Sequence, residues 1–409
     1  MYHRNGYDHR DEVIDVRLRV AILTILILGF TVSPVQGQEA FETIELPGRG
    51  AGTIAVHPVD GSIWAFMHQT GALVAVDPSD GSVLLESPLN LRPTAMEFSP
   101  DGEYVYIVGE PLSDQVYDRG KLVGINTADG STVIDMELDG ACNAVHIGDS
   151  AVYVACGMQY AYEGTVYRLT PDEIDNNLLI DASASCGKIP WAIAELDGIL
   201  YVTDLELQWT MQADGSMGPP YGSYVWAYHA DNLELIDKTW VGLNPCKLGV
   251  LGSGVMAACS GSKQTDLRLE PALSYIRSPG ESEPVFIDTS GASDLDVSPD
   301  GTWAAVTLAD WGPPAAFSGM SVIQHYAPGT LDDVRRWIFT GDIGVISMEN
   351  GSIITERYRI SDESYFRAVE ISLDGTSVYA LLGETDEVMI IPVEYLVGLP
   401  VDGREQQAE

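Results

Sequence analysis

The chain has 409 residues, of which 45% are hydrophobic and 20% are charged, so it is too apolar to be intrinsically disordered and long enough to bury a large core. Its 60 acidic and 21 basic residues give a formal net charge of −39. A surface of that sign repels polyphosphate and anionic lipid, so we expect neither nucleic acid nor a bare membrane surface as a partner. It suits a high-salt medium, and it equally suits an ordinary acidic exported protein.

The amino-terminal segment has the pattern of a signal peptide. Arg17 and Arg19 precede an apolar run over residues 20–32, which small residues follow up to Gly37. The run is short for a bilayer span. We therefore predict a signal peptide over residues 1–37, a secreted or periplasmic protein, and no stable membrane insertion after cleavage. An uncleaved anchor is the alternative, and the polar residues at the very start suggest that translation begins further downstream.

A strand–turn–strand unit then recurs along the chain. Its clearest copies contain Ser-Pro-Asp-Gly or Ser-Leu-Asp-Gly, and Asp-Gly supplies the positive φ angles that tight hairpins need. The clear copies begin at Pro93, Ala292 and Phe366. Degenerate copies begin near Gly52, Cys142, Pro190 and Pro245, which brings the number to seven.

Further strands follow several of these hairpins. Residues 72–76 and 121–126 resemble third strands, and residues 82–87 and 132–138 resemble fourth strands. Four antiparallel strands repeated in this way are typical of propeller blades. The sequence thus predicts an all-β, seven-bladed β-propeller of four-stranded antiparallel blades over residues 38–398. A disordered acidic tail is predicted over residues 399–409.

The last copy of the repeat has no fourth strand after it. Residues 41–46, Phe-Glu-Thr-Ile-Glu-Leu, resemble the fourth strands elsewhere, so we predict that this N-terminal strand closes the ring and removes an exposed sheet edge. Residues 342–364 do not fit the pattern and are interpreted as an insertion or a partial eighth blade. Eight blades is accordingly the alternative to seven.

The repeat resembles the YVTN β-propeller family, which is named for a Tyr-Val-Thr-Asn run on the second strand. The matching run here is Tyr201-Val202-Thr203-Asp204, and the resemblance covers nearly all of the mature chain. It implies the propeller fold. The family and its neighbours include surface-layer components, lactonase-like proteins and subunits of periplasmic quinoprotein amine dehydrogenases. Because the shared motif is structural, the resemblance assigns no catalytic residue.

Four of the five cysteines fall at matching ends of two predicted hairpins. If strand pairing is symmetric about the turns, Cys142 faces Cys156 and Cys246 faces Cys259. In an exported protein this placement predicts two disulfides. Buried thiols are the alternative, and Cys186 is left over.

Long connections between the predicted second and third strands define a loop-rich face. Binding residues tend to lie on loops held by a rigid scaffold, so the aromatic residues of these loops are candidate ligand contacts. The alternative is that they only pack the loops against each other. The candidates are Trp209, Tyr221 and Trp311.

Several polar residues enter the first strands at the same face. Four of them are basic and would form a local positive site for a carboxylate or another small anion, unless each pairs with a surface acid. The candidate residues are Arg92, Asn143, Lys188, Lys247, Asp294 and Arg367.

A second set of polar residues occupies one column of the first strand. If their side chains lean into the central channel, they would bind a divalent cation such as calcium, since oxygen ligands suit that ion. Hydrated channel carboxylates are the alternative. The column consists of Glu97, His146, Asp296 and Glu370.

Sequence motifs of hydrolase triads, zinc sites and phosphate-binding loops are absent. We therefore favour an exported propeller that binds a small molecule or a protein through its loop-rich face. The alternative is an enzyme, either a lactonase-like metal-dependent hydrolase or the propeller subunit of a periplasmic quinoprotein dehydrogenase.

Overall fold

The structure is a computed structural model. It describes residues 41–112, 119–157, 163–171, 178–206, 222–260, 271–287, 291–309, 339–349, 351–361, 364–383 and 385–397. The predicted signal peptide and the predicted acidic tail lie outside these residues.

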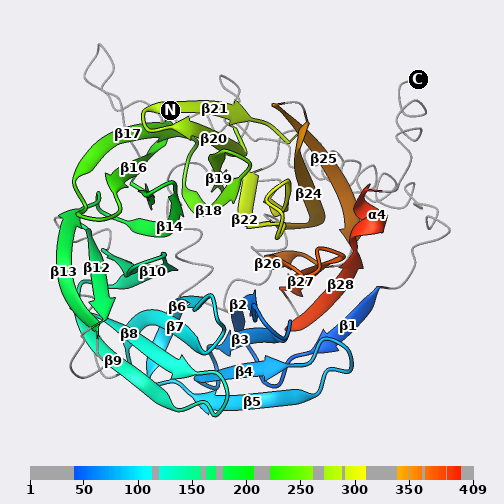
Figure 1. The fold of residues 1–409 in the computed structure, drawn as a ribbon. Helices are drawn as coiled ribbons and strands as arrows, with labels where there is room; N and C mark the ends of the chain where they lie inside the picture. Colours follow the sequence, from blue (N-terminus) through cyan, green and yellow to red (C-terminus); the bar gives the residue numbers. More distant parts are fainter. Residues whose placement is uncertain are drawn as a thin grey trace, which may run out of the picture. The chain divides into compact units, whose positions relative to one another are not determined.

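The described strands form seven four-stranded antiparallel sheets arranged in a ring (Figure 1). Blade 1 is built from β2 (Ala51–Val56), β3 (Ile63–Met67), β4 (Ala72–Val76) and β5 (Val83–Pro88), and blade 2 from β6 (Leu91–Phe98), β7 (Tyr104–Pro111), β8 (Arg119–Asn126) and β9 (Thr132–Asp139). Blade 3 is built from β10 (Cys142–Ile147), β11 (Val152–Cys156), β12 (Thr165–Pro171) and β13 (Leu178–Ser185). Blade 4 is built from β14 (Pro190–Leu196), β15 (Ile199–Asp204), β16 (Ser223–His229) and β17 (Leu235–Val241).

Blades 5 to 7 follow the same order. Blade 5 is built from β18 (Pro245–Leu251), β19 (Gly254–Cys259), β20 (Leu273–Ser278) and β21 (Glu281–Val285). Blade 6 is built from β22 (Gly291–Val297), β23 (Trp303–Ala309), β24 (Phe339–Glu349) and β25 (Ser352–Ser361). Blade 7 is built from β26 (Phe366–Ile371), β27 (Ser377–Leu382), β28 (Glu387–Pro392) and β1 (Glu42–Glu45). A short helix, α4 (Val393–Val397), follows β28. The predicted seven-bladed propeller is confirmed.

Local turn chemistry explains why the first two strands of blades 2, 6 and 7 form hairpins. In blade 2, the Ser99 hydroxyl donates to the Asp101 carboxylate at 2.6 Å, and the same carboxylate accepts the backbone N–H of Glu103 at 3.0 Å. Gly102 completes the turn at a φ of 72°, where a side chain would be strained. The same Ser–Asp hydrogen bond recurs between Ser298 and Asp300 and between Ser372 and Asp374.

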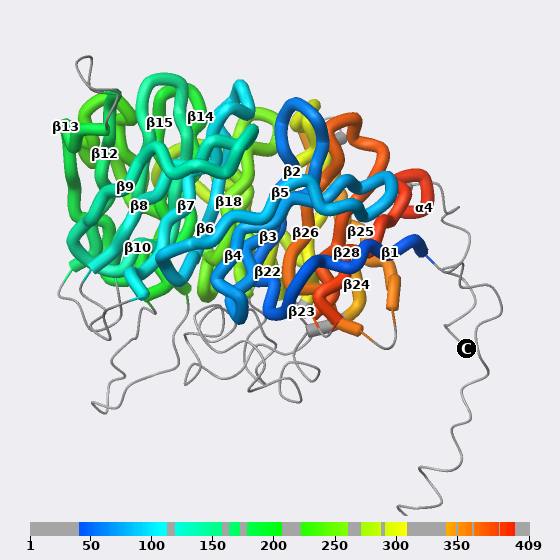
Figure 2. The backbone as a smooth tube through the Cα atoms, turned by 90° about the horizontal axis from the view of Figure 1, so that it is seen from below, coloured from blue at the N-terminus to red at the C-terminus, as the bar shows by residue number. Residues whose placement is uncertain are grey.

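The hydrophobic core lies between the blades. Trp64 and Phe66 on β3 pack with Val105 and Ile107 on β7, so one face of blade 1 is buried against blade 2. The strands run from one face of the ring to the other (Figure 2). The first strand of each blade stands at the end of its sheet and pairs on one side only, so its other edge is open, and these edges surround the axis.

The two ends of the described chain close the ring, as predicted. β1 pairs antiparallel with β28 over Glu42–Glu45, and Figure 1 shows the two strands side by side. The Asp386 carboxylate also accepts the backbone N–H groups of Gly50 and Ala51 at 2.9 and 3.0 Å. The last blade is therefore joined to the first by both a strand and a side chain.

The interpretation of residues 342–364 as an insertion or a partial eighth blade is wrong. β24 and β25 are the third and fourth strands of blade 6, paired antiparallel from Gly341 to Glu349. Their connection contains Asn350-Gly351, a strong hairpin signal, and Gly351 has a φ of 78°. The third strand of blade 6 begins at Phe339 instead of directly after Gly319, so the connection from β23 is longer than expected.

Candidate functional site

A cavity of about 500 Å³ lies on the axis of the ring. Its lining residues come from the first strand of every blade, namely β2, β6, β10, β14, β18, β22 and β26. Figure 1 shows these strands innermost. Each of them has a sheet partner on one side only, so its other edge presents backbone N–H and C=O groups that need partners.

Side chains near the start of four first strands satisfy carbonyl groups of the next blade. Each lies at a register irregularity, where one extra residue turns a side chain towards the neighbouring strand. The hydrogen bonds run from Thr94 to the carbonyl of Cys142 (2.6 Å), from Asn143 to Pro190 (3.0 Å), from Cys246 to Ala292 (3.5 Å, through sulfur) and from Arg367 to Ala51 (3.0 Å). The candidate ligand contacts Asn143 and Arg367 thus join adjacent blades.

Carboxylates further along the first strands do the reverse and accept backbone N–H groups. Asp294 accepts the N–H of Val369 (3.0 Å), and Asp296 accepts the N–H of Ile371 (2.7 Å). Glu97 accepts the N–H of Ile147 (3.2 Å). These three acids therefore hold blade 6 to blade 7 and blade 2 to blade 3. This role could not be read from the sequence, because donor and acceptor lie on different blades.

The four predicted cations are each within reach of an acid. Arg92 lies 4.0 Å from Glu110, Lys247 lies 3.5 Å from Asp294, and Arg367 lies 3.4 Å from Asp386. Lys188 pairs with Glu206. The Arg367 side chain is only 8% exposed, and it contacts both the backbone and Asp386. The local excess of positive charge that would attract a small anion is therefore neutralised.

The predicted metal column is divided between two sectors of the channel. His146 Nδ1 lies 3.0 Å from a Glu97 oxygen, whereas Asp296 and Glu370 lie in the sector that also contains Lys247. Among the described residues, no group of three or more His, Cys, Asp or Glu side chains is placed to bind a metal ion. The four residues therefore do not form one cluster in the described structure: Glu97 is bonded to His146 and to the N–H of Ile147, and Asp296 accepts the N–H of Ile371.

The sector of blades 5 to 7 has unusual electrostatics. Burial raises the pKa of Asp296 to about 6, although the N–H of Ile371 and the charge of Lys247 oppose that rise. Burial and the nearby charge of Asp296 raise the pKa of Glu370 as well. The pKa of Lys247 is raised mainly by Asp294. The channel thus keeps its lysine charged and disfavours ionisation of two of its acids.

The sector of blades 2 to 4 includes a residue that sequence analysis missed. Glu195 on β14 lines the cavity, and its charge, after that of Glu97, raises the pKa of His146 against the lowering effect of burial. A Cβ on Gly148 would lie 2.2 Å from a Glu195 oxygen, so the glycine leaves room for this carboxylate. A glycine at the end of β10 is the only local signal of the contact.

The aromatic candidates Trp209, Tyr221 and Trp311 lie outside the described residues. In the sequence, Trp209 and Tyr221 lie between β15 and β16, and Trp311 lies between β23 and β24; β15 ends and β16 begins at one face of the ring. The same face receives the ends of β7, β11, β19 and β23.

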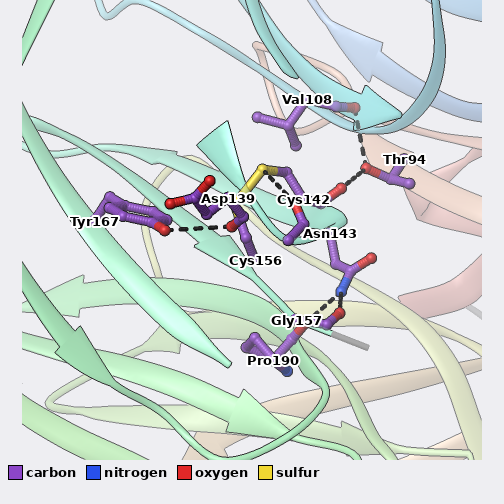
Figure 3. Close-up of a disulfide and its surroundings, with 10 residues drawn as sticks. Thr94, Val108, Asp139, Cys142, Asn143, Cys156, Gly157, Tyr167 and Pro190 are labelled. Atoms are coloured by element: carbon purple, nitrogen blue, oxygen red, sulfur yellow. Dashed lines mark hydrogen bonds between the residues drawn. A yellow bond between two sulfur atoms is a disulfide. The ribbon is translucent and has the colours of Figure 1, made fainter. Parts of the chain in front are cut away.

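One of the two predicted disulfides is confirmed. Cys142 and Cys156 are bonded and both are buried at the start of β10 and the end of β11. Figure 3 shows the disulfide beside Thr94 and Asn143, whose hydrogen bonds hold the same segment. The disulfide therefore fixes the loop-face end of this hairpin.

The predicted Cys246–Cys259 disulfide is wrong. Both cysteines carry buried thiols that are not bonded to each other. The residue opposite Cys259 is Pro245, and Cys246 lies at the register shift that follows. Its sulfur is directed at backbone carbonyls, including that of Ser293 at 3.2 Å. Symmetric counting about the turn failed by one residue because it ignored the bulge.

Among the described residues, no helix is both long enough and apolar enough to cross a bilayer. No protein family model matches the sequence, and no curated protein matches it.

The structure is similar to several solved propellers. Hydrazine synthase of Kuenenia stuttgartiensis is 13% identical over 88% of this chain and 99% of that chain, with a TM-score of 0.56. The β-propeller domain of Cps50 (Swd1) of Myceliophteria thermophila is 9% identical over 86% of this chain and 99% of that domain, with a TM-score of 0.55. A chain of the mitotic checkpoint complex is 8% identical over 89% of this chain and 97% of that chain, with a TM-score of 0.56. At these identities the likeness shows the fold alone.

Proposed function

We propose that this protein is an exported, noncatalytic binding module that takes up its ligand or partner at the loop-rich face and the mouth of the central channel. The observation that supports this most is the closed ring, in which a strand from the N-terminal end completes the last blade. A closed ring holds the strand ends of one face in a fixed arrangement, and recognition residues are commonly carried on such a scaffold.

Export is supported by the buried Cys142–Cys156 disulfide, since disulfides persist in oxidising compartments. The net charge of −39 favours partners that are neutral or basic over nucleic acid. The metal-dependent hydrolase alternative draws no support from the described channel residues, because they form no metal-ligand cluster.

The test is capture of partners by residues 38–409 from the extracytoplasmic fraction of the source cells, identified by mass spectrometry. The loop-face variant carries Trp209→Ser and Trp311→Ser. The matched control is Glu103→Gln, an exposed residue of the β6–β7 turn on the opposite face. We expect the loop-face variant alone to lose its ligand. Substrate turnover that disappears on changing one loop-face residue would overturn the noncatalytic assignment.

A further inference from the structure

The charges in the channel do not balance. Glu97 pairs with His146 at 3.0 Å, and Asp294 pairs with Lys247 at 3.5 Å. Asp296 accepts a backbone N–H at 2.7 Å but has no cation of its own. Glu370 lines the cavity, and in the described part of the chain its carboxylate has no hydrogen bond or ion pair.

As a result, ionisation is disfavoured for two neighbouring carboxylates. Burial raises the pKa of both Asp296 and Glu370. The charge of Asp296 raises the pKa of Glu370 further, and the charge of Asp294 raises that of Asp296. Lys247 attracts both groups but is held closest to Asp294. One further positive charge in the cavity would stabilise the ionised carboxylates and relieve their mutual repulsion.

The shape and lining of the cavity indicate what kind of cation fits. A bare calcium ion needs six to eight oxygen ligands, and the described carboxylates are not grouped to provide them. An organic ammonium needs only one or two carboxylates. Two sectors of the wall carry small side chains against which an apolar body would pack: Gly52, Thr53 and Ala55 from β2, and Ala192 and Ala194 from β14. A volume of about 500 Å³ is typical of small-molecule sites.

We propose that the central channel binds a small organic molecule with a primary ammonium group, whose nitrogen lies against Asp296 and Glu370. This inference rests on the proposed binding function and names its ligand class. A free amine and the lysine side chain of a partner protein share this chemistry. The proposal commits to the free amine, since the site lies on the channel axis among the first strands.

Calorimetric titration of the mature chain tests the proposal. The probe is butylammonium, with 1-butanol and butyrate as neutral and anionic controls at equal ionic strength and calcium chloride as the metal control. We expect saturable binding of butylammonium only. Asp296→Asn and Glu370→Gln should each weaken it by about tenfold. Glu234→Gln, at an exposed turn position, is the matched control and should change nothing.

The pH dependence gives a second readout that a purely structural role would not produce. Protons compete with the ammonium for the carboxylates, so binding should strengthen as pH rises from about 5 to about 7 and should release protons, which is seen as a dependence of the heat on the buffer. Glu370→Gln should reduce the proton release. The other charged or titratable groups of the cavity wall are Glu97, His146, Glu195, Lys247, Asp294 and Arg367.

Four outcomes decide the question. Binding of butylammonium that is lost in both carboxylate variants supports the proposal. Binding of a lysine-containing peptide but not of butylammonium overturns the free-amine assignment in favour of a partner's lysine. Equal binding of butanol, or no saturable binding of any probe, overturns the ammonium site itself. Captured partners that depend on Trp209 and Trp311 would then still support the loop-face function, so the two failures are distinguishable.

Discussion

The inner hairpins of blades 3 and 5 have nearly the same sequence plan and different chemistry. Both end in a cysteine, and both contain a one-residue register shift near the start. In blade 3, Cys142 precedes the shift and is opposite Cys156, so a disulfide forms. In blade 5, Cys246 lies at the shift and directs its sulfur at the next blade. A displacement of one residue relative to a bulge therefore decides between a covalent and a noncovalent link.

The same two hairpins also place one basic side chain each in the channel. His146 pairs with Glu97 of the preceding blade, whereas Lys247 pairs with Asp294 of the following blade. The charge and hydrogen bond of Glu97 outweigh burial and raise the pKa of His146, whereas the lysine stays charged because Asp294 raises its already high pKa. Hence the two sectors should respond differently to pH and to mutation.

The largest difference is expected for the cysteines. Replacing Cys142 and Cys156 with alanine should lower the free energy of unfolding by about 3 kcal/mol, since the bond closes a loop with a sequence separation of 14. Thermal unfolding with and without reductant measures this. The Cys246→Ala, Cys259→Ala variant should keep the wild-type response to reductant. A wild-type protein insensitive to complete reduction would contradict the assignment.

The next largest effect is expected at the lysine pair. Lys247→Met should cost about 2 kcal/mol because it leaves the buried Asp294 carboxylate without its cation, although Lys247 is itself 37% exposed. Adding Asp294→Asn to the same chain should recover most of the loss. Denaturant unfolding of the two single variants and the double variant gives the coupling energy, and strict additivity would show that the pair does not interact.

A smaller, pH-dependent effect is expected at the histidine pair. Burial lowers the pKa of His146, but the charge and hydrogen bond of Glu97 outweigh it and raise the pKa above 6.5. The pair therefore stabilises the fold below pH 6.5, and that stabilisation is lost as pH rises through the folded pKa. Glu97→Gln should cost about 1 kcal/mol near pH 5.5 and less as the pH rises through the folded pKa of His146. NMR titration of the His146 ring should show a lower pKa in the variant, and an unchanged pKa would refute the pairing.

The smallest effect is expected for Cys246→Ser. A hydroxyl keeps the donor that the thiol directs at the carbonyls of Ala292 and Ser293, so the free energy of unfolding should change by less than about 0.5 kcal/mol. Thermal unfolding in the presence of reductant provides the measurement. A loss as large as that of the Cys142, Cys156 variant would mean that Cys246 has a covalent partner in solution.

Local sequence signals predict the fold to the level of single hairpins. The Ser-Pro-Asp-Gly turns, the alternation of the strands and the closing strand at residues 41–46 are local signals, because turn angles and hydrogen bonds within a few residues produce them. The prediction for blade 6 fails because its second hairpin, at Asn350-Gly351, follows a connection longer than those of the other blades. The Asn-Gly turn signal is present in the sequence, but it lies further along the chain than the spacing of the other blades predicts.

The chemistry of the channel depends instead on contacts between different blades. His146 and Glu97 are 49 residues apart, and their contact depends on the register of two strands in different blades. The same holds for the N–H groups of Val369 and Ile371, which turned two candidate metal or ligand residues into links between blades. A sequence specifies which side chains point along one strand, whereas the phase of each bulge and the packing of adjacent sheets determine which charges meet.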